Sequence, residues 1–432
     1  MADLKRKIDS STAVVGVLGM GYVGLPLALE FARKGFRVRG FDVDASRIRA
    51  LRSGRSYIGD VASSLLKEQA AAGRFRAENG FDAVSGCDAL IICVPTPLRK
   101  TKEPDVSYIL NASSEVVPRL AKGRLVVLES TTYPGTTREL VLPLFEKRGM
   151  KVGKDFFLAF SPERVDPSNP RYRIENTPKV VGGITPACGR LAAALYSKVV
   201  GNVVSVSSAD TAEMVKLLEN TFRAVNIGLV NEMALMCHKL GLDVWEVIEA
   251  ASTKPFGFMP FYPGPGLGGH CIPVDPHYLA WKMKALNFEP RFIELAGVIN
   301  GSMPEHSVAR MGDLLNRRGM PVRGSGILVL GAAYKPDVND VRESPSLDVI
   351  KLLLDLGAQV SYHDPHVPEL RIEGKKMRST PLTPANLRKA DLVAVLTAHS
   401  SVDYGSVVRH ARLVFDARNA SKGLRGSGLF RL

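Results

Sequence analysis

The sequence contains little cysteine and no long apolar run. Its 432 residues include five cysteines, an odd number without CxxC spacing. Neither a disulfide framework nor a zinc site is therefore indicated, and we expect no bound metal and a reducing, cytoplasmic location. Gly, Arg or Asp interrupts every long apolar stretch before it reaches the ~18–20 residues that a membrane-spanning helix needs. We therefore expect no membrane insertion.

Aromatic residues make up only 7% of the chain and charged residues 23%, while 39 glycines and 27 prolines are spread along its length. This composition is that of an ordinary globular protein and argues against a disordered, collagenous or coiled-coil chain. With 45% hydrophobic residues, the chain has enough apolar material for two or three hydrophobic cores.

Acidic residues are outnumbered, since 57 Lys and Arg face 43 Asp and Glu and the formal net charge is +14. Such an excess suits an anionic partner, which could be nucleic acid, an anionic membrane surface or a phosphorylated small molecule. The basic residues are scattered rather than gathered into a stripe. We therefore expect no nucleic-acid partner and interpret most of this charge as ordinary solvated surface.

A strand, a glycine-rich turn and a helix are predicted near the N-terminus. The apolar run 13–18 precedes GMGYVG, helix-forming residues follow over 25–34, and the alternating segment 36–41 ends at Asp42. This pattern predicts a βαβ unit of roughly 30 residues. A GxGxxG motif alone is a weak signal, but in this context it is typical of a dinucleotide-binding fold. The expected cofactor-binding residues of the turn are Gly19, Met20, Gly21, Tyr22, Val23 and Gly24.

Each glycine of the turn has its own expected role. Gly19 permits the tight turn, Gly21 lets a pyrophosphate approach the backbone, and Gly24 lets the helix pack closely on the strand. The helix N-terminus supplies N–H groups and partial positive charge for the phosphates. Asp42 would accept hydrogen bonds from the adenosine ribose, which favours NAD because a 2′-phosphate would face a carboxylate.

Two further strands are predicted at 88–94 and 125–129, each followed by a turn-rich loop, at 95–97 and 130–135. Ligands of open α/β sheets bind beyond the carboxyl ends of the strands, so we expect both loops to line the cofactor crevice. Pro and Thr are also common in loops that bind nothing.

A long helix and a second βαβ pattern follow. Residues 209–240 carry an apolar stripe at helical spacing without proline, which predicts a long helix between two domains. This helix could also be a dimer interface or an ordinary core helix. A strand at 326–334, a helix at about 346–356 and a strand at 358–364 then repeat the βαβ pattern without GxGxxG.

The expected fold class is α/β, with two Rossmann-like doubly wound domains joined by a long central helix. Further strands at 392–396 and 413–415 complete the second domain. The expected parts are an N-terminal NAD-binding domain at 1–205, a central helical region at 206–308 and a C-terminal domain at 309–432.

Cys271 ends the densest glycine stretch of the chain, which contains Gly264, Gly266, Gly268 and Gly269. A loop of this type brings the backbone close to a ligand. A cysteine is usually a buried structural thiol, but Cys271 is bracketed by Gly, His, Pro and Asp, which favours a nucleophile. With a nicotinamide cofactor, a nucleophilic thiolate predicts oxidation at the aldehyde level through a thiohemiacetal and a thioester.

Five motifs in order resemble the nucleotide-sugar 6-dehydrogenase family over nearly the whole chain. They are GMGYVGLPLA (19–28), SPERVDPSN (161–169), AEMVKLLENTFRAVNI (212–227), PGPGLGGHCIPVDP (263–276) and YKPDVNDVRESPSLDVI (334–350). The resemblance implies a four-electron oxidation of the C6 alcohol of a UDP-sugar to a carboxylate, with two NAD used in succession at one active site.

The resemblance also implies roles for single residues. Cys271 resembles the nucleophile that holds the thiohemiacetal and thioester. Lys216 and Asn220, one helical turn apart, match the pair that stabilises the developing oxyanion. Without the resemblance, Lys216 could simply be a lysine that snorkels from a helix.

Three further side chains match the groups that act on water. Asp275 resembles the carboxylate that orients the catalytic water, Thr131 would share that water, and Glu163 matches the carboxylate of thioester hydrolysis. The implied cofactor contacts outside the turn are Asp42, Arg47, Pro95, Thr96, Thr131 and, from the second domain, Arg342. The implied substrate contacts are Glu163, Arg164, Lys216, Asn220, Tyr262, Gly266, Gly268, Lys335 and Arg418.

Two departures bear on the sugar. The UDP-glucose enzymes usually carry a serine before the cysteine and a lysine before the following aspartate, whereas this chain has His270 and Val274. It resembles the branch that acts on N-acetylated hexosamines, so UDP-N-acetylglucosamine is the leading substrate, and UDP-N-acetylmannosamine and UDP-glucose stay open. The UDP-uronic acid product would feed surface polysaccharide synthesis, and a homodimer through the long helix is expected.

Two other classes of protein fit parts of the pattern. A hydroxy-acid or hydroxyacyl dehydrogenase also joins a Rossmann domain to helices, but would not need Cys271. A non-catalytic nucleotide-binding protein would use the net charge to bind polynucleotides in a salt-dependent way.

Overall fold

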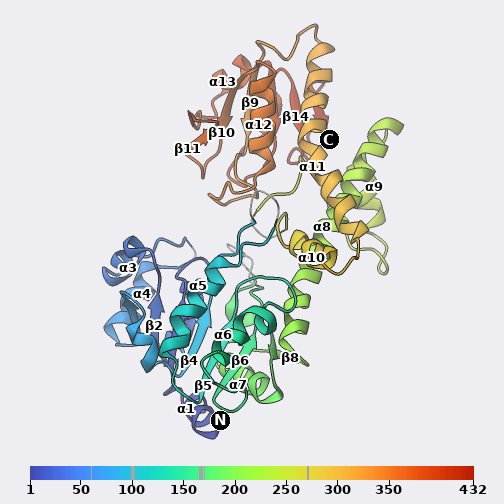
Figure 1. Ribbon diagram of the computed structural model, residues 1–432. Helices are drawn as coiled ribbons and strands as arrows, with labels where there is room; N and C mark the ends of the chain where they lie inside the picture. The colour runs from blue at the N-terminus through green and yellow to red at the C-terminus, as the bar shows by residue number, and fades with distance from the viewer. Residues whose placement is uncertain (60, 99–102, 165–168, 170, 270–271) are drawn as a thin grey trace. The chain divides into compact units, whose positions relative to one another are not determined.

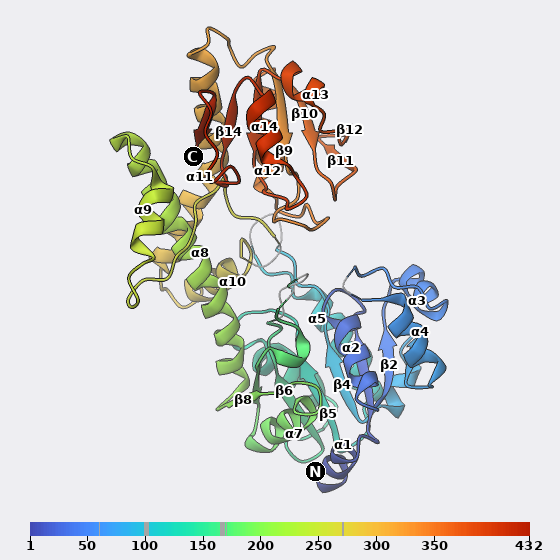
Figure 2. The same ribbon diagram turned by 180° about the vertical axis from the view of Figure 1, so that it is seen from behind.

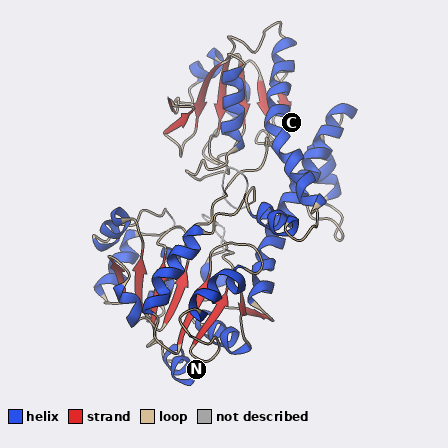
Figure 3. Cartoon of the chain, viewed as in Figure 1, coloured by secondary structure: helices blue, strands red, loops and turns tan. Residues whose placement is uncertain are grey.

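The computed structural model describes residues 1–432 except 60, 99–102, 165–168, 170 and 270–271 (Figure 1). The chain divides into two compact units. The first comprises Met1–Glu219 and His277–Asn287, and the second comprises Asn220–Pro276 and Phe288–Leu432. Each unit contains a sheet with helices packed on both of its faces (Figure 3).

The first unit is built on an eight-stranded sheet. Its strands are β1 (Val14–Leu18), β2 (Arg37–Phe41), β3 (Phe75–Glu78), β4 (Ala89–Ile92), β5 (Arg124–Leu128), β6 (Phe156–Phe160), β7 (Lys179–Gly183) and β8 (Val203–Val206). Its helices are α1 (Ala2–Asp9), α2 (Gly24–Arg33), α3 (Ala45–Arg52), α4 (Ser63–Ala71), α5 (Ser107–Val116), α6 (Leu142–Glu146) and α7 (Pro186–Tyr196). The four strands predicted here form within a few residues of their expected bounds.

The strand order is β3-β2-β1-β4-β5-β6-β7-β8. All neighbours pair in parallel except β6 and β7, which are antiparallel. From β1 to β3 successive strands are added toward one edge of the sheet, and from β4 onward they are added toward the other edge. The switch point therefore lies between β1 and β4, and open α/β sheets bind ligands at such a point. The turn after β1 and the loop after β4 therefore flank the expected cofactor crevice.

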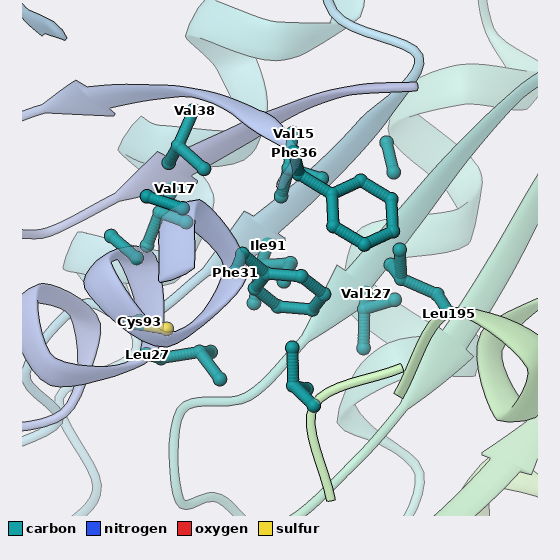
Figure 4. Close-up of a cluster of buried hydrophobic side chains, with 14 of the residues drawn as sticks. Val15, Val17, Leu27, Phe31, Phe36, Val38, Ile91, Cys93, Val127 and Leu195 are labelled. Atoms are coloured by element: carbon teal, nitrogen blue, oxygen red, sulfur yellow. The ribbon is translucent and has the colours of Figure 1, made fainter. Parts of the chain in front are cut away.

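Alternation along β1 sends successive side chains to opposite faces of this sheet. Val15 and Val17 join one core with residues of α2 and α7, whereas Leu18 joins the other core with residues of α5 and α6. In the first core the rings of Phe31 and Phe36 meet edge to face, with centroids 5.6 Å apart (Figure 4). These buried cores hold the strand ends in fixed positions.

The predicted long helix is confirmed as α8 (Ala209–Leu240). The boundary between the two units falls within it, after Glu219. A second long helix, α11 (Arg291–Asn316), was not predicted and continues through Pro304. The other helices of this part of the chain are α9 (Val244–Ala251), α10 (Asp275–Lys284), α12 (Pro345–Asp355), α13 (Pro384–Lys389) and α14 (Tyr404–His410).

The second unit contains a five-stranded, all-parallel sheet in the order β10-β9-β13-β14-β15. The strands are β9 (Gly326–Leu330), β10 (Gln359–His363), β13 (Leu392–Val395), β14 (Val414–Asp416) and β15 (Leu429–Arg431). A hairpin of β11 (Glu369–Ile372) and β12 (Lys375–Arg378) lies beside β10 (Figure 2). Here the switch point lies between β9 and β13.

The predicted α/β class with two Rossmann-like domains is confirmed, since both sheets are doubly wound. The three-part division at residues 205 and 308 stays a prediction. Among the described residues, no helix combines the length and the apolar character needed to cross a bilayer.

Candidate active site

The glycine turn after β1 forms as predicted. Gly19 has a φ of +94°, and a Cβ there would lie 2.5 Å from the carbonyl oxygen of Cys93. A Cβ on Gly24, the first residue of α2, would overlap the carbonyl oxygen of Gly19. Both positions therefore require glycine for the fold itself.

Gly21 differs from its two neighbours in the motif. A Cβ built on it would meet no protein atom within 4 Å, and its φ lies outside the left-handed region. The fold thus has no need of glycine at this position, which fits the role of leaving room for a ligand. Of the other turn residues, Met20 is buried, Val23 is half-buried and Tyr22 is exposed.

Asp42, directly after β2, is tied to the turn. Its carboxylate accepts a hydrogen bond from the Met20 amide at 2.9 Å and pairs with Arg47 at 3.2 Å. The hydroxyl of Tyr57 donates to the Met20 carbonyl at 2.7 Å, and the Arg47 guanidinium lies over the Tyr57 ring. Burial raises the pKa of Tyr57, so its hydroxyl stays a donor. Tyr57 was missed because no motif marks it.

The loops after β4 and β5 carry the predicted residues Pro95, Thr96 and Thr131. Pro95 is exposed, and Thr96 and Thr131 are half-buried. The hydroxyl of Tyr278 donates to the carbonyl of Thr96.

Glu213, on α8, fixes the loop that follows Thr131. Its fully buried carboxylate accepts hydrogen bonds from the Gly135 amide at 2.6 Å, the Thr137 amide at 2.9 Å and the Thr137 hydroxyl at 2.6 Å. Burial raises the pKa of Glu213 to about 7 although these hydrogen bonds oppose the rise. Sequence reasoning missed Glu213, since its partners lie more than 70 residues away.

Glu163, Arg164 and Lys216 are brought together in the first unit. The ammonium of Lys216 donates to the backbone carbonyl of Glu163 at 2.6 Å. The Glu163 carboxylate accepts the Arg164 amide at 2.8 Å, and the Arg164 guanidinium pairs with Glu219 at 2.7 Å. The structure therefore holds three of the predicted residues in one hydrogen-bonded group; their roles stay predictions.

Asn220 and Asp275 are brought together in the second unit. The Asn220 amide donates to the Asp275 carboxylate, and both residues are buried, with 3% and 2% of their surface exposed. Asn220 lies four residues after Lys216 in α8, so their side chains leave the helix on the same side. Cys271 and His270 lie outside the described residues, as do residues 165–168 of the SPERVDPSN motif.

The glycine loop before Cys271 packs closely on the loop after β9. A Cβ on Gly268 would lie 2.7 Å from the Cβ of Tyr334, and one on Gly269 would lie 2.8 Å from the Tyr334 ring. A Cβ on Gly264 would overlap the guanidinium of Arg418, and Gly266 has a φ of +135°. The packing and backbone conformation of this loop therefore explain why these positions are glycine.

Two predicted cations, Lys335 and Arg418, belong to loops at the carboxyl ends of the second sheet. The Lys335 ammonium lies 5.8 Å from the centroid of the Tyr334 ring. The Arg418 guanidinium donates to the Leu396 carbonyl at 2.9 Å, and burial lowers the pKa of Arg418 to about 10 although Asp416 opposes the change. An ammonium and a guanidinium group suit an anion such as a diphosphate.

Two other predicted residues have defined neighbours. Arg342 forms an ion pair with Asp340 at 2.6 Å. Tyr262 is half exposed and its ring stacks on Trp245, with centroids 6.2 Å apart. These contacts do not test the predicted binding of the cofactor by Arg342 or of the substrate by Tyr262.

Within the described part of the chain, Asp337, His366 and His399 place their potential ligand atoms within 4.8 Å of one another. The Nδ1 atom of His399 accepts a hydrogen bond from the Asp337 amide at 3.1 Å, so its lone pair is engaged. The Nε2 atom then carries the proton and donates to Asp364 at 3.0 Å. This geometry favours a group that holds the loop after β9 over a metal site.

Three family models match successive parts of the chain. They are those of the UDP-glucose/GDP-mannose dehydrogenase family, with its NAD binding domain at residues 13–200, its central domain at 210–302 and its UDP binding domain at 328–423.

Curated relatives and solved structures are similar over most of their length. The UDP-N-acetyl-D-glucosamine 6-dehydrogenase of Pseudomonas aeruginosa is 37% identical over 355 residues, which are 82% of this chain and 83% of that protein. The UDP-N-acetyl-D-mannosamine dehydrogenase of Pyrococcus horikoshii is 35% identical and covers 94% of this chain and 96% of its own length. A solved structure of UDP-D-ManNAc dehydrogenase from Pyrococcus horikoshii has a TM-score of 0.88 at 33% identity, covering 97% of this chain and 98% of that one.

Proposed function

Because this chain belongs to the UDP-glucose/GDP-mannose dehydrogenase family, we propose that it oxidises the C6 hydroxyl of a UDP-sugar to a carboxylate, with Cys271 as the nucleophile. Its cofactor is NAD, since residues 13–200 match the NAD-binding domain of that family. One observation carries the proposed chemistry: the buried hydrogen bond between Asn220 and Asp275 joins two of the expected catalytic groups.

The reaction needs two hydride transfers. C6 first loses a hydride, which NAD would accept when bound, and the hydroxyl proton passes to water, which leaves an aldehyde. The Cys271 thiolate then forms an S–C bond to the aldehyde carbon while the π electrons move onto oxygen. Lys216 and Asn220 donate hydrogen bonds to this oxygen. Lys216 has three ammonium hydrogens, so it can do this while it holds the Glu163 carbonyl.

A second hydride loss converts the thiohemiacetal to a thioester, which water hydrolyses. The new O–C bond forms, the C–S bond breaks, the thiol leaves as thiolate, and a proton of the water passes to a carboxylate. We assign Glu163 to accept this proton, and Asp275 with Thr131 to orient the water. Burial of Asp275 beside the Asn220 amide fixes the direction of its carboxylate.

The two sheets divide the binding of cofactor and substrate in this proposal. The turn after β1 with Asp42 and Arg47 binds NAD, supported by the open space at Gly21. Lys335 and Arg418 bind the UDP diphosphate, supported by their place at the carboxyl ends of the second sheet.

UDP-N-acetylglucosamine is the proposed sugar nucleotide. It is supported by the Pseudomonas aeruginosa relative and by His270 and Val274 around Cys271. UDP-N-acetylmannosamine is the second candidate, because the Pyrococcus horikoshii relative covers more of the chain. Turnover of UDP-glucose, UDP-N-acetylglucosamine, UDP-N-acetylgalactosamine and UDP-N-acetylmannosamine by wild type and Cys271→Ser tests the proposal. We expect one sugar to react and the variant to form no net acid; an unimpaired variant would contradict the thiol mechanism.

We also propose that the protein is a homodimer. Large apolar side chains are exposed along two packed helices of the second unit, on α8 at Phe222, Leu229, Met233, Met236 and Leu240 and on α11 at Phe292, Leu295 and Val298. The two helices contact each other at Gly228 and Ala296, and large apolar side chains exposed together on packed helices are typical of a protein interface. A cytoplasmic location is proposed as well, supported by four buried cysteines that are free thiols.

A further inference from the structure

A lysine that no motif marked lies between two carboxylates in the first unit. Lys179 forms ion pairs with Glu129 and, at 3.4 Å, with Oε2 of Glu163. The exposed fractions of the three side chains are 8%, 0% and 14%. The hydroxyl of Tyr196, also fully buried, donates to the second oxygen of Glu129. These four groups form one buried network that ends at Glu163.

The network is held by neighbouring elements of one sheet. Glu129 directly follows β5 and Lys179 is the first residue of β7, and both strands flank β6, which the chain leaves shortly before Glu163. Tyr196 is the last residue of α7, which packs on the same strands. Because strand pairing fixes β5, β6 and β7, the position of the Lys179 ammonium is fixed by the fold.

The charges in the network depend on one another. Burial lowers the pKa of Lys179, but Glu129 and Glu163 outweigh this and raise it above its ordinary value, so the amine is an ammonium ion. Burial raises the pKa of Glu129, while the Lys179 ammonium opposes the rise by favouring the charged carboxylate. A buried ammonium without its carboxylates would be strongly unfavourable. Glu129 therefore keeps Lys179 charged and in place beside Glu163.

Glu163 is held from three sides. One carboxylate oxygen faces the Lys179 ammonium, the other accepts the Arg164 amide at 2.8 Å, and Lys216 holds the backbone carbonyl. The titratable and charged groups around it among the described residues are Lys179, Glu129, Tyr196, Cys93, Lys216 and Arg164, with Glu219 beyond Arg164. The Lys179 ammonium faces a carboxylate oxygen of Glu163 directly.

We propose that Lys179 is a positioning residue for the reaction: anchored by Glu129 and Tyr196, its ammonium keeps the Glu163 carboxylate ionised and aimed for thioester hydrolysis. This inference rests on the proposed function, in which Glu163 takes a proton from water as the O–C bond forms and the C–S bond breaks. Lys179 itself neither bonds to the substrate nor gives up a proton. It acts through Glu163 by fixing its charge and direction.

The test compares Lys179→Met, Lys179→Arg and the double variant Lys179→Met with Glu129→Gln. The double variant removes both charges of the buried pair, so it leaves no unpaired ion there and keeps the test open if Lys179→Met fails to fold. Lys198→Met is the control for loss of a lysine in the same unit, since the Lys198 ammonium donates to the backbone carbonyl of Asp9 and pairs with no carboxylate among the described residues. Thermal melting and circular dichroism establish that each variant is folded.

In rapid-mixing experiments with NAD and the reactive UDP-sugar, the folded Lys179→Met and double variants should give a burst of two NADH per site followed by slow turnover. We expect kcat to fall by about 100-fold, a size typical of general acid–base effects, and KM for the UDP-sugar to change by less than about threefold. The acidic limb of the kcat profile should move to higher pH, because loss of the cation makes Glu163 easier to protonate. Lys179→Arg should restore most of the hydrolysis rate.

A double variant with wild-type hydrolysis and an unchanged pH profile would overturn the inference while leaving the proposed function intact. Equal slowing of the hydride transfers and of thioester hydrolysis, with no burst of NADH, would also overturn it, because that result indicates a purely structural role. If wild-type protein released no NADH from any UDP-sugar, the proposed function and this inference would both be wrong.

Discussion

Replacing Gly21 by alanine separates a glycine needed by a ligand from glycines needed by the fold. The new methyl group would meet no protein atom within 4 Å, and the backbone there is not left-handed. The free energy of unfolding should therefore change by no more than about 0.5 kcal/mol. In a chain of 432 residues that corresponds to a melting shift of no more than about 0.6 °C.

The effect on NAD binding should be much larger. If the pyrophosphate approaches the backbone at Gly21, the methyl group displaces it and at least one hydrogen bond to a charged group is lost, at a cost of about 1.5–3 kcal/mol. The dissociation constant of NAD should then rise by about 10- to 150-fold. Titration calorimetry measures this constant, and differential scanning fluorimetry measures the melting temperature.

Two alanine variants serve as controls. In Gly24→Ala the new methyl group would overlap the carbonyl oxygen of Gly19, so this variant should have a lower melting temperature even without NAD. In Gly189→Ala, in α7, the new Cβ would come no closer than 3.5 Å to another atom, the backbone nitrogen of Gly183, so this variant should change neither property. Wild-type affinity for NAD in a folded Gly21→Ala protein would refute the assignment of this turn to the pyrophosphate.

Two further predictions concern stability and assembly. The pKa of Glu213 is raised in the folded state, from its ordinary 4.5 to about 7, so its contribution to stability is present below pH 4.5 and is lost as the pH rises through about 7. Urea unfolding of Glu213→Gln between pH 5 and 8 should show a smaller loss of stability with rising pH than wild type, and an equal loss would contradict the assignment. Leu229→Glu should shift the protein from dimer to monomer in light-scattering chromatography, whereas Leu356→Glu should not. A Leu229→Glu protein that stays dimeric would place the interface elsewhere.

Features of the fold that depend on residues close together in the chain could be predicted from the sequence. The turn from Gly19 to Gly24 and the bounds of α8 could be predicted because glycine spacing and apolar periodicity are local signals. Strands β6 and β8 were missed, since FFLAF is uniformly apolar and VVSV is short, and neither shows a clear alternation. Helix α11 was missed because its internal Pro304 reads as a helix end.

The site was only partly predictable for a related reason. Lys216, Glu163, Asn220 and Asp275 stand in motifs, and the structure pairs them within each unit. The network around Lys179 was not found, because Glu129 lies 50 residues from it in the chain. A signal was nevertheless present: Glu129 directly follows the apolar strand LVVL and Lys179 opens KVVGG. A charged residue at the end of a buried strand needs a partner, and only the sheet order shows which one.

The central claim is a four-electron oxidation at a single site, and the most direct measurement counts NADH released per molecule of sugar consumed. Wild-type protein should release two NADH for each molecule of one UDP-sugar and produce the corresponding uronic acid. Release of one NADH with an aldehyde as the product would contradict the account, because it would leave no step for the Cys271 thioester.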